Sequence, residues 1–144
     1  MKRNVRSDDG NALVEFVYLA VLLLIPLVYV MITVFLVQRA AFGTTEAARQ
    51  AGRAYARADT ITQAQARGTA AAGLAMRDQG VSAPPNTRFD CVGGCLAPGS
   101  RVRVTVSSFV RLPVLGRVFG DQQRGGIRVQ ATHTEYVDRF ASSR

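Results

Sequence analysis

The pattern of apolar and polar positions first marks a long uncharged run near the start of the chain. Residues 16–37 read FVYLAVLLLIPLVYVMITVFLV and contain no charged side chain. A helix of this length extends about 33 Å, enough to cross the hydrocarbon core of a bilayer. The run is too long for the apolar part of an ordinary secretory signal, and the QRAAF that follows offers no convincing small-x-small cleavage site. The pattern therefore predicts a membrane-spanning helix, which we place at residues 11–38.

Helical periodicity continues after this span, and it predicts a helical stem at residues 39–80. Small residues recur on one stripe beside Tyr55 and should allow close packing, whereas arginines recur on the opposite side and should stay solvated. Gly43, followed by two threonines, is expected to form a joint where the helix leaves the membrane. The two stripes comprise Ala47, Ala51, Ala54 and Ala58 on the small side, and Arg49, Arg53 and Arg57 on the basic side.

A second helix is expected in the later part of this stem. Asp59 or Thr60 can cap its start, and Gly80 can end it. Its glycines lower helix propensity, so it should need packing against the rest of the fold. The small, apolar face predicted to supply that packing consists of Ile61, Ala64, Gly68, Ala71 and Ala75.

Strict alternation then replaces the helical period and predicts β-strands within a C-terminal domain at residues 81–144. RVRVTVSSFV directs Val102, Val104 and Val106 to one face, and GIRVQATHTEYV alternates in the same way. Continuing that parity puts His133 and Glu135 on the inner face, where a bulge, a sheet end or a mutual contact would accommodate them. The predicted fold class is α+β: a long N-terminal transmembrane helix, a second packed helix and a small antiparallel C-terminal sheet.

The segment between the last two strands, RLPVLGRVFGDQQRGG, is rich in apolar residues. It can cover the core of the β domain, or it can form a patch that meets the bilayer surface or another subunit.

Two cysteines flank a pair of glycines in CVGGC, at Cys91 and Cys95. A CxxC redox motif is excluded by this spacing, and a metal site would need further ligands, for which His133 is the only histidine. Two readings stay open: a local disulfide formed in an oxidising compartment, or two reduced thiols in a cytosolic domain.

Composition narrows the possible chemistry. The chain carries 18 Lys and Arg against 10 Asp and Glu, a net charge of +8. The basic residues are spread along the chain without a run of five, so no nucleic-acid partner is expected. No nucleophile has a placed partner and no glycine-rich phosphate loop occurs, so we expect no catalytic residues, no metal, no cofactor and no enzymatic activity. A structural histidine at a sheet edge is the commoner alternative to a catalytic His133.

Glu15 is the one charged residue that enters the apolar helix. An ionised carboxylate in hydrocarbon costs roughly 2.5–3.5 kcal/mol on insertion scales, so such a residue usually has a partner. It lies four residues after Asn11, one helical turn away and on the same face. A simpler explanation is that an acid in the first turn complements the helix dipole.

The run Gly10-Asn11-Ala12-Leu13-Val14-Glu15-Phe16, preceded by the charged stretch MKRNVRSDDG, resembles the class III signal of type IV pilins and pseudopilins. The layout of the remaining chain resembles the TadE-like proteins of Tad (tight adherence) pilus systems. This resemblance implies a prepilin-type leader at residues 1–10, cleavage between Gly10 and Asn11 by prepilin peptidase, and a role in assembly for Glu15 and Phe16.

The same resemblance implies a minor pilin or pseudopilin of a Flp type IVb pilus. Its implied partners are prepilin peptidase, the major Flp pilin, other minor pilins, the inner-membrane Tad assembly platform and the lipid bilayer. It also implies a single-pass protein of the cell membrane or the pilus, with a cytoplasmic N-terminus and an extracytoplasmic C-terminal domain. The numbers of Lys and Arg residues on the two sides of the span are nearly balanced and do not set the orientation. The alternatives are an uncleaved, membrane-anchored accessory or binding protein of the cell envelope, and an envelope enzyme built around His133.

Overall fold

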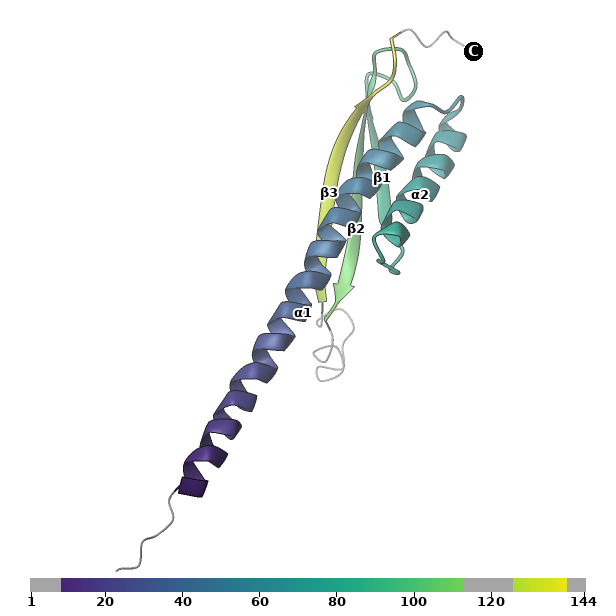
Figure 1. Ribbon diagram of the computed structural model, residues 1–144. Helices are drawn as coiled ribbons and strands as arrows, with labels where there is room; N and C mark the ends of the chain where they lie inside the picture. Colours follow the sequence, from purple (N-terminus) through teal and green to yellow (C-terminus); the bar gives the residue numbers. More distant parts are fainter. Residues whose placement is uncertain (1–8, 113–125, 140–144) are drawn as a thin grey trace, which may run out of the picture. The chain divides into compact units, whose positions relative to one another are not determined.

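The computed structural model describes residues 9–112 and 126–139. Within these residues the order of elements is α1 (Asp9–Ala56), α2 (Ile61–Asp78), β1 (Asn86–Val92), β2 (Arg101–Arg111) and β3 (Gly126–Tyr136) (Figure 1). The predicted α+β class is confirmed. Most of the apolar segment between β2 and β3 lies outside the described residues, as does most of the expected leader.

The chain divides into two compact units, Met1–Val34 and Phe35–Arg144. The first unit is represented by the N-terminal part of α1, which continues through Pro26 as helix. Its side chains from residue 12 to residue 34 are exposed or half-exposed. The second unit holds the rest of α1, the second helix and the sheet. Helix α1 also runs without interruption across the expected boundary between residues 38 and 39.

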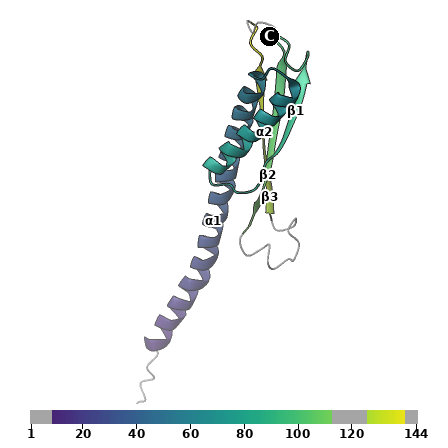
Figure 2. The same cartoon turned by 90° about the vertical axis from the view of Figure 1, so that its right-hand side faces the viewer.

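The second unit is a three-stranded antiparallel sheet, in the order β1-β2-β3, with helices packed on one face (Figures 1 and 2). Val104 in the central strand lies opposite Phe89 of β1 and His133 of β3. Alternate residues of β2 are buried, as the sequence pattern predicted. The core that joins sheet and helices includes Ala47, Ala51, Tyr55, Ala64, Ala72, Met76, Val102, Val104 and Val106.

The expected joint at Gly43 is wrong, because α1 continues through it. The hydroxyls of Thr44 and Thr45 donate to the carbonyl of Ala41, at 3.0 and 2.8 Å, and so stay within the helix. A Cβ atom at Gly43 would lie 3.2 Å from Met76 Sδ. The glycine therefore allows close packing in the core and does not break the helix.

Helix α2 begins and ends where the sequence predicted, but its buried face is shifted. Thr60 Oγ1 accepts a hydrogen bond from the Gln63 amide at 3.3 Å, and Gly80 adopts φ +70° just beyond the helix. The prediction that Ile61 faces the core is wrong, since half of its surface is exposed. Ala72 and Met76 occupy the buried stripe instead.

Candidate functional site

The expected cleavage position lies at the very start of α1. Gly10 and Asn11 belong to its first turn, where backbone N–H groups have no partner inside the helix. Few hydrogen bonds therefore hold this peptide bond in helical form. The helical backbone brings Glu15 one turn after Asn11, about 6 Å farther along the axis and on the same face.

Glu15 and Phe16 follow the expected cleavage position in the described part of α1. The Glu15 side chain is exposed, and Phe16 is 72% exposed. The side chains that follow them, up to Val34, are also exposed or half-exposed. One helix, from Ala12 onward, is long and apolar enough to cross a membrane, judged by length and composition within the described part of the chain. Helix α1 is thus suited to be a membrane anchor, and its exposed side chains need lipid or other helices around them.

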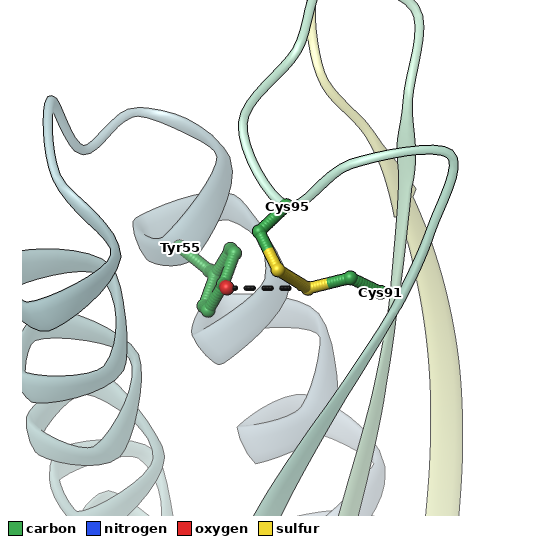
Figure 3. The surroundings of a disulfide bond; sticks show 3 residues. All are labelled: Tyr55, Cys91 and Cys95. Carbon is green, nitrogen blue, oxygen red and sulfur yellow. Dashed lines mark hydrogen bonds between the residues drawn. A yellow bond between two sulfur atoms is a disulfide. The ribbon is translucent and has the colours of Figure 1, made fainter.

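The two cysteines form a disulfide at the end of β1, the pairing that the first of the two readings expects (Figure 3). Cys91 lies in the strand and Cys95 in the loop after it, with Cα atoms 5.0 Å apart. The intervening Gly93 and Gly94 adopt φ +83° and +102°, values that favour glycine. This loop can therefore close tightly enough for the two sulfur atoms to bond.

Tyr55 connects the disulfide to the core. Its hydroxyl lies 3.4 Å from Cys91 Sγ (Figure 3). Its ring also stacks on Phe89, with centroids 4.9 Å apart. Burial raises the pKa of the Tyr55 hydroxyl above its usual value. The disulfide, the tyrosine and the phenylalanine join the loop after β1 to both β1 and α1.

His133 and Glu135 lie on the inner face of the sheet, as the alternation predicted. They face Val104 and Val102 of the central strand, and His133 Nε2 lies 3.2 Å from Glu135 Oε2. A Cβ atom at Gly52 of α1 would lie 3.1 Å from Glu135 Cβ, so the helix backbone passes close over this pair. Of the arrangements that the sequence allowed, the structure has the mutual contact, in which the His133 ring and the Glu135 carboxylate pair with each other at the edge of the core. Among the described residues, no group of three His, Cys, Asp or Glu could hold a metal ion.

Sequence reasoning missed Arg39, which links the two helices of the second unit. Its Nε and Nη2 atoms donate to the Gln79 carbonyl, at 3.2 and 3.0 Å, where α2 ends. Its guanidinium also lies 5.5 Å above the Phe35 ring. An arginine at a helix C-terminus is favourable, but a partner 40 residues away leaves no local signal.

No protein family, curated protein or solved structure matches the chain. The fold itself defines a class of protein: one exposed apolar helix that is long enough to anchor the protein in a membrane, followed by a disulfide-bonded α+β domain.

Proposed function

We propose that the chain is a TadE-like minor pilin or pseudopilin that takes part in assembly of a Tad/Flp type IVb pilus. It acts as a structural subunit and not as an enzyme. The observation that carries the proposal is the position of Glu15, one turn after Gly10–Asn11, at the head of a helix whose side chains from Ala12 to Val34 are exposed or half-exposed. Between Asn11 and Gln38, Glu15 is the only charged residue.

Cleavage by prepilin peptidase between Gly10 and Asn11 would create an α-ammonium at the N-terminus of α1. Glu15 would then pair with this ammonium, in the same subunit or in a neighbour. Two opposite unit charges about 4 Å apart attract each other by about 4 kcal/mol at an effective dielectric constant near 20. This attraction is of the same size as the roughly 2.5–3.5 kcal/mol cost of placing the acid in hydrocarbon and offsets much of it. The pairing would therefore favour lateral insertion among like helices and set their axial register.

The disulfide supports an extracytoplasmic location for the C-terminal domain, because such bonds persist in oxidising compartments. The N-terminus would then be cytoplasmic, on the side where prepilin peptidase cuts its substrates. The partners that follow are this peptidase, the major Flp pilin, other minor pilins and the inner-membrane Tad assembly platform.

The proposal is tested with Glu15→Gln in cells that carry the Tad machinery. Cross-linking of intact cells, followed by isolation of the major pilin, measures how much of the chain is assembled with it. Removing the charge should lower this amount at least about tenfold, because the attraction to the terminal ammonium is lost. Glu46→Gln is the matched control. Glu46 also lies in α1, but its Oε1 accepts a hydrogen bond from the side-chain Nε2 of Gln50 at 2.6 Å.

Assembly of Glu15→Gln at the wild-type level would contradict the pairing. If neither wild type nor variant associated with the pilin, and the protein kept Met1, the uncleaved membrane-anchored accessory protein would be the better account.

A further inference from the structure

The face of the sheet that the helices leave open is strongly basic. Both helices lie on the other face, and no described element covers this one (Figure 2). The alternation along the three strands sends five arginines and a single carboxylate, Asp90, to the open face. These arginines are Arg88, Arg101, Arg103, Arg111 and Arg128.

Among the described residues, five arginines against one carboxylate leave this face with an excess of positive charge. Arg88, Arg103 and Arg128 form no ion pair within the described part of the chain. Arg101 lies 6.0 Å from the Tyr136 ring, which is itself 62% exposed. Residues two apart on a strand are about 7 Å apart and neighbouring strands about 4.8 Å, so several guanidinium groups share one small area. Such a field attracts an anion with more than one charge.

Three shallow hollows follow one another along this face. A hollow of about 480 Å³ is lined in part by Phe109 and Arg128. It shares Arg128 with the next, of about 350 Å³, which also holds Arg88 and Asp90. The third, of about 380 Å³, is lined by Arg101, Arg103 and Tyr136 among others. From residue 109 to residue 101 the strand spans about 27 Å, so the hollows form a track suited to a linear chain.

We propose that this track binds a linear polysaccharide that carries carboxylates, such as one built from uronic acids. The guanidinium groups would bind the carboxylates through paired, charge-assisted hydrogen bonds. Between the arginines lie groups that can hydrogen-bond sugar hydroxyls, and Tyr136 can contact the apolar face of a sugar ring. The polar groups between the arginines are Asn86, Asp90, Thr105, Ser107, Gln130, Thr132 and Thr134.

The same details disfavour a single-stranded nucleic acid. Asp90 lies directly opposite Arg103 in the middle of the face, where it can accept a hydrogen bond from a sugar hydroxyl. Proteins that bind single strands stack successive bases on aromatic rings. Here Tyr136 lies at one end of the track and the half-buried Phe109 at the other, with no aromatic residue between them on the three strands of this face. The surface lies within Phe35–Arg144, so this inference does not depend on processing at Gly10.

The test is a calorimetric titration of the full chain in detergent micelles with hexagalacturonate. Maltohexaose, a neutral chain of equal length, and a single-stranded oligodeoxynucleotide of equal charge are the comparison ligands. We expect saturable binding of hexagalacturonate that weakens with added salt, no binding of maltohexaose and weaker binding of the oligonucleotide. Arg88→Gln and Arg103→Gln should each weaken hexagalacturonate binding about tenfold, because each removes a hydrogen-bonded charge. Arg67→Gln, which removes an exposed arginine from α2, should leave it unchanged.

Absence of hexagalacturonate binding at low salt would overturn the proposal. An equal loss in Arg67→Gln would also overturn it, since the effect would then reflect net charge alone. Tighter binding of the oligonucleotide would assign the face to nucleic acid instead. Near-ultraviolet circular dichroism of each variant, compared with that of wild type, establishes that a loss of binding is not a loss of fold.

Discussion

Gly68 in α2 offers a sharp test of how closely the helices pack on the sheet. A Cβ atom at this position would lie 2.6 Å from Phe89 Cζ, 2.8 Å from Phe89 Cε1 and 3.2 Å from the Ala51 carbonyl oxygen. Carbon atoms in favourable contact are about 3.5–4.0 Å apart. Gly68→Ala therefore adds a methyl group where no space exists.

Two effects of opposite sign compete in this variant. Alanine is favoured over glycine inside a helix by about 1 kcal/mol. Inserting a methyl group into a filled core costs about 1–3 kcal/mol, and the Phe89 ring cannot move aside freely because it stacks on Tyr55. We expect the steric cost to exceed the helical gain, so that Gly68→Ala lowers the free energy of unfolding by about 1 kcal/mol.

Gly73 supplies a matched control in the same helix. A Cβ atom there would meet only Arg77 Nη1, at 3.5 Å, which belongs to an exposed and flexible side chain. Gly73→Ala should therefore raise the free energy of unfolding by about 0.5–1 kcal/mol. Urea unfolding of the full chain in micelles, followed by near-ultraviolet circular dichroism, measures both variants. If Gly68→Ala is stabilised as much as Gly73→Ala, the close approach of α2 to β1 is refuted.

Three further predictions concern the second unit. Replacing Cys91 and Cys95 together by serine should lower the free energy of unfolding by about 2 kcal/mol, the value that the chain-entropy model gives for so short a loop. Urea unfolding without reductant measures this loss. Burial raises the pKa of the Tyr55 hydroxyl above 10.0, so the folded state keeps a proton that the unfolded chain loses. The contribution of Tyr55 to the free energy of unfolding should therefore be complete below pH 10.0 and be lost as pH rises through the folded pKa. Tyr55→Phe should reduce this fall, and an unchanged pH profile would contradict it. Thr60→Ala should cost about 1 kcal/mol through loss of the cap on the Gln63 amide, visible in the thermal midpoint.

Local patterns predicted the elements well, because each signal lies within a few residues. The uncharged run, the valine alternation in β2 and the Thr60 cap each depend on near neighbours. The structure confirms the alternation and the cap, and it shows a helix long and apolar enough to cross a membrane. The sequence left two readings for Cys91 and Cys95, because the glycines between them allow a closed loop but do not set the redox state; the structure has the disulfide.

Contacts between distant segments were the part that the sequence could not supply. In sequence, Gly43 and Gly68 each look like a weak point in a helix. In the structure, the missing side chain of Gly43 leaves room for Met76, and that of Gly68 leaves room for Phe89. The bond from Arg39 to the end of α2 and the gathering of arginines on one open sheet face also depend on tertiary pairing. The role of Glu15 stays a prediction, because its proposed partner is created only by processing.

The most direct test of the central claim is the N-terminal residue of the mature protein. The chain is produced in cells with and without prepilin peptidase, isolated from the membrane, and examined by intact mass and N-terminal sequencing. The account predicts a terminus at Asn11 when the peptidase is present, loss of residues 1–10 from the mass, and no cleavage when Gly10 is replaced by leucine. A mature protein that still begins at Met1 in the presence of an active peptidase would contradict it.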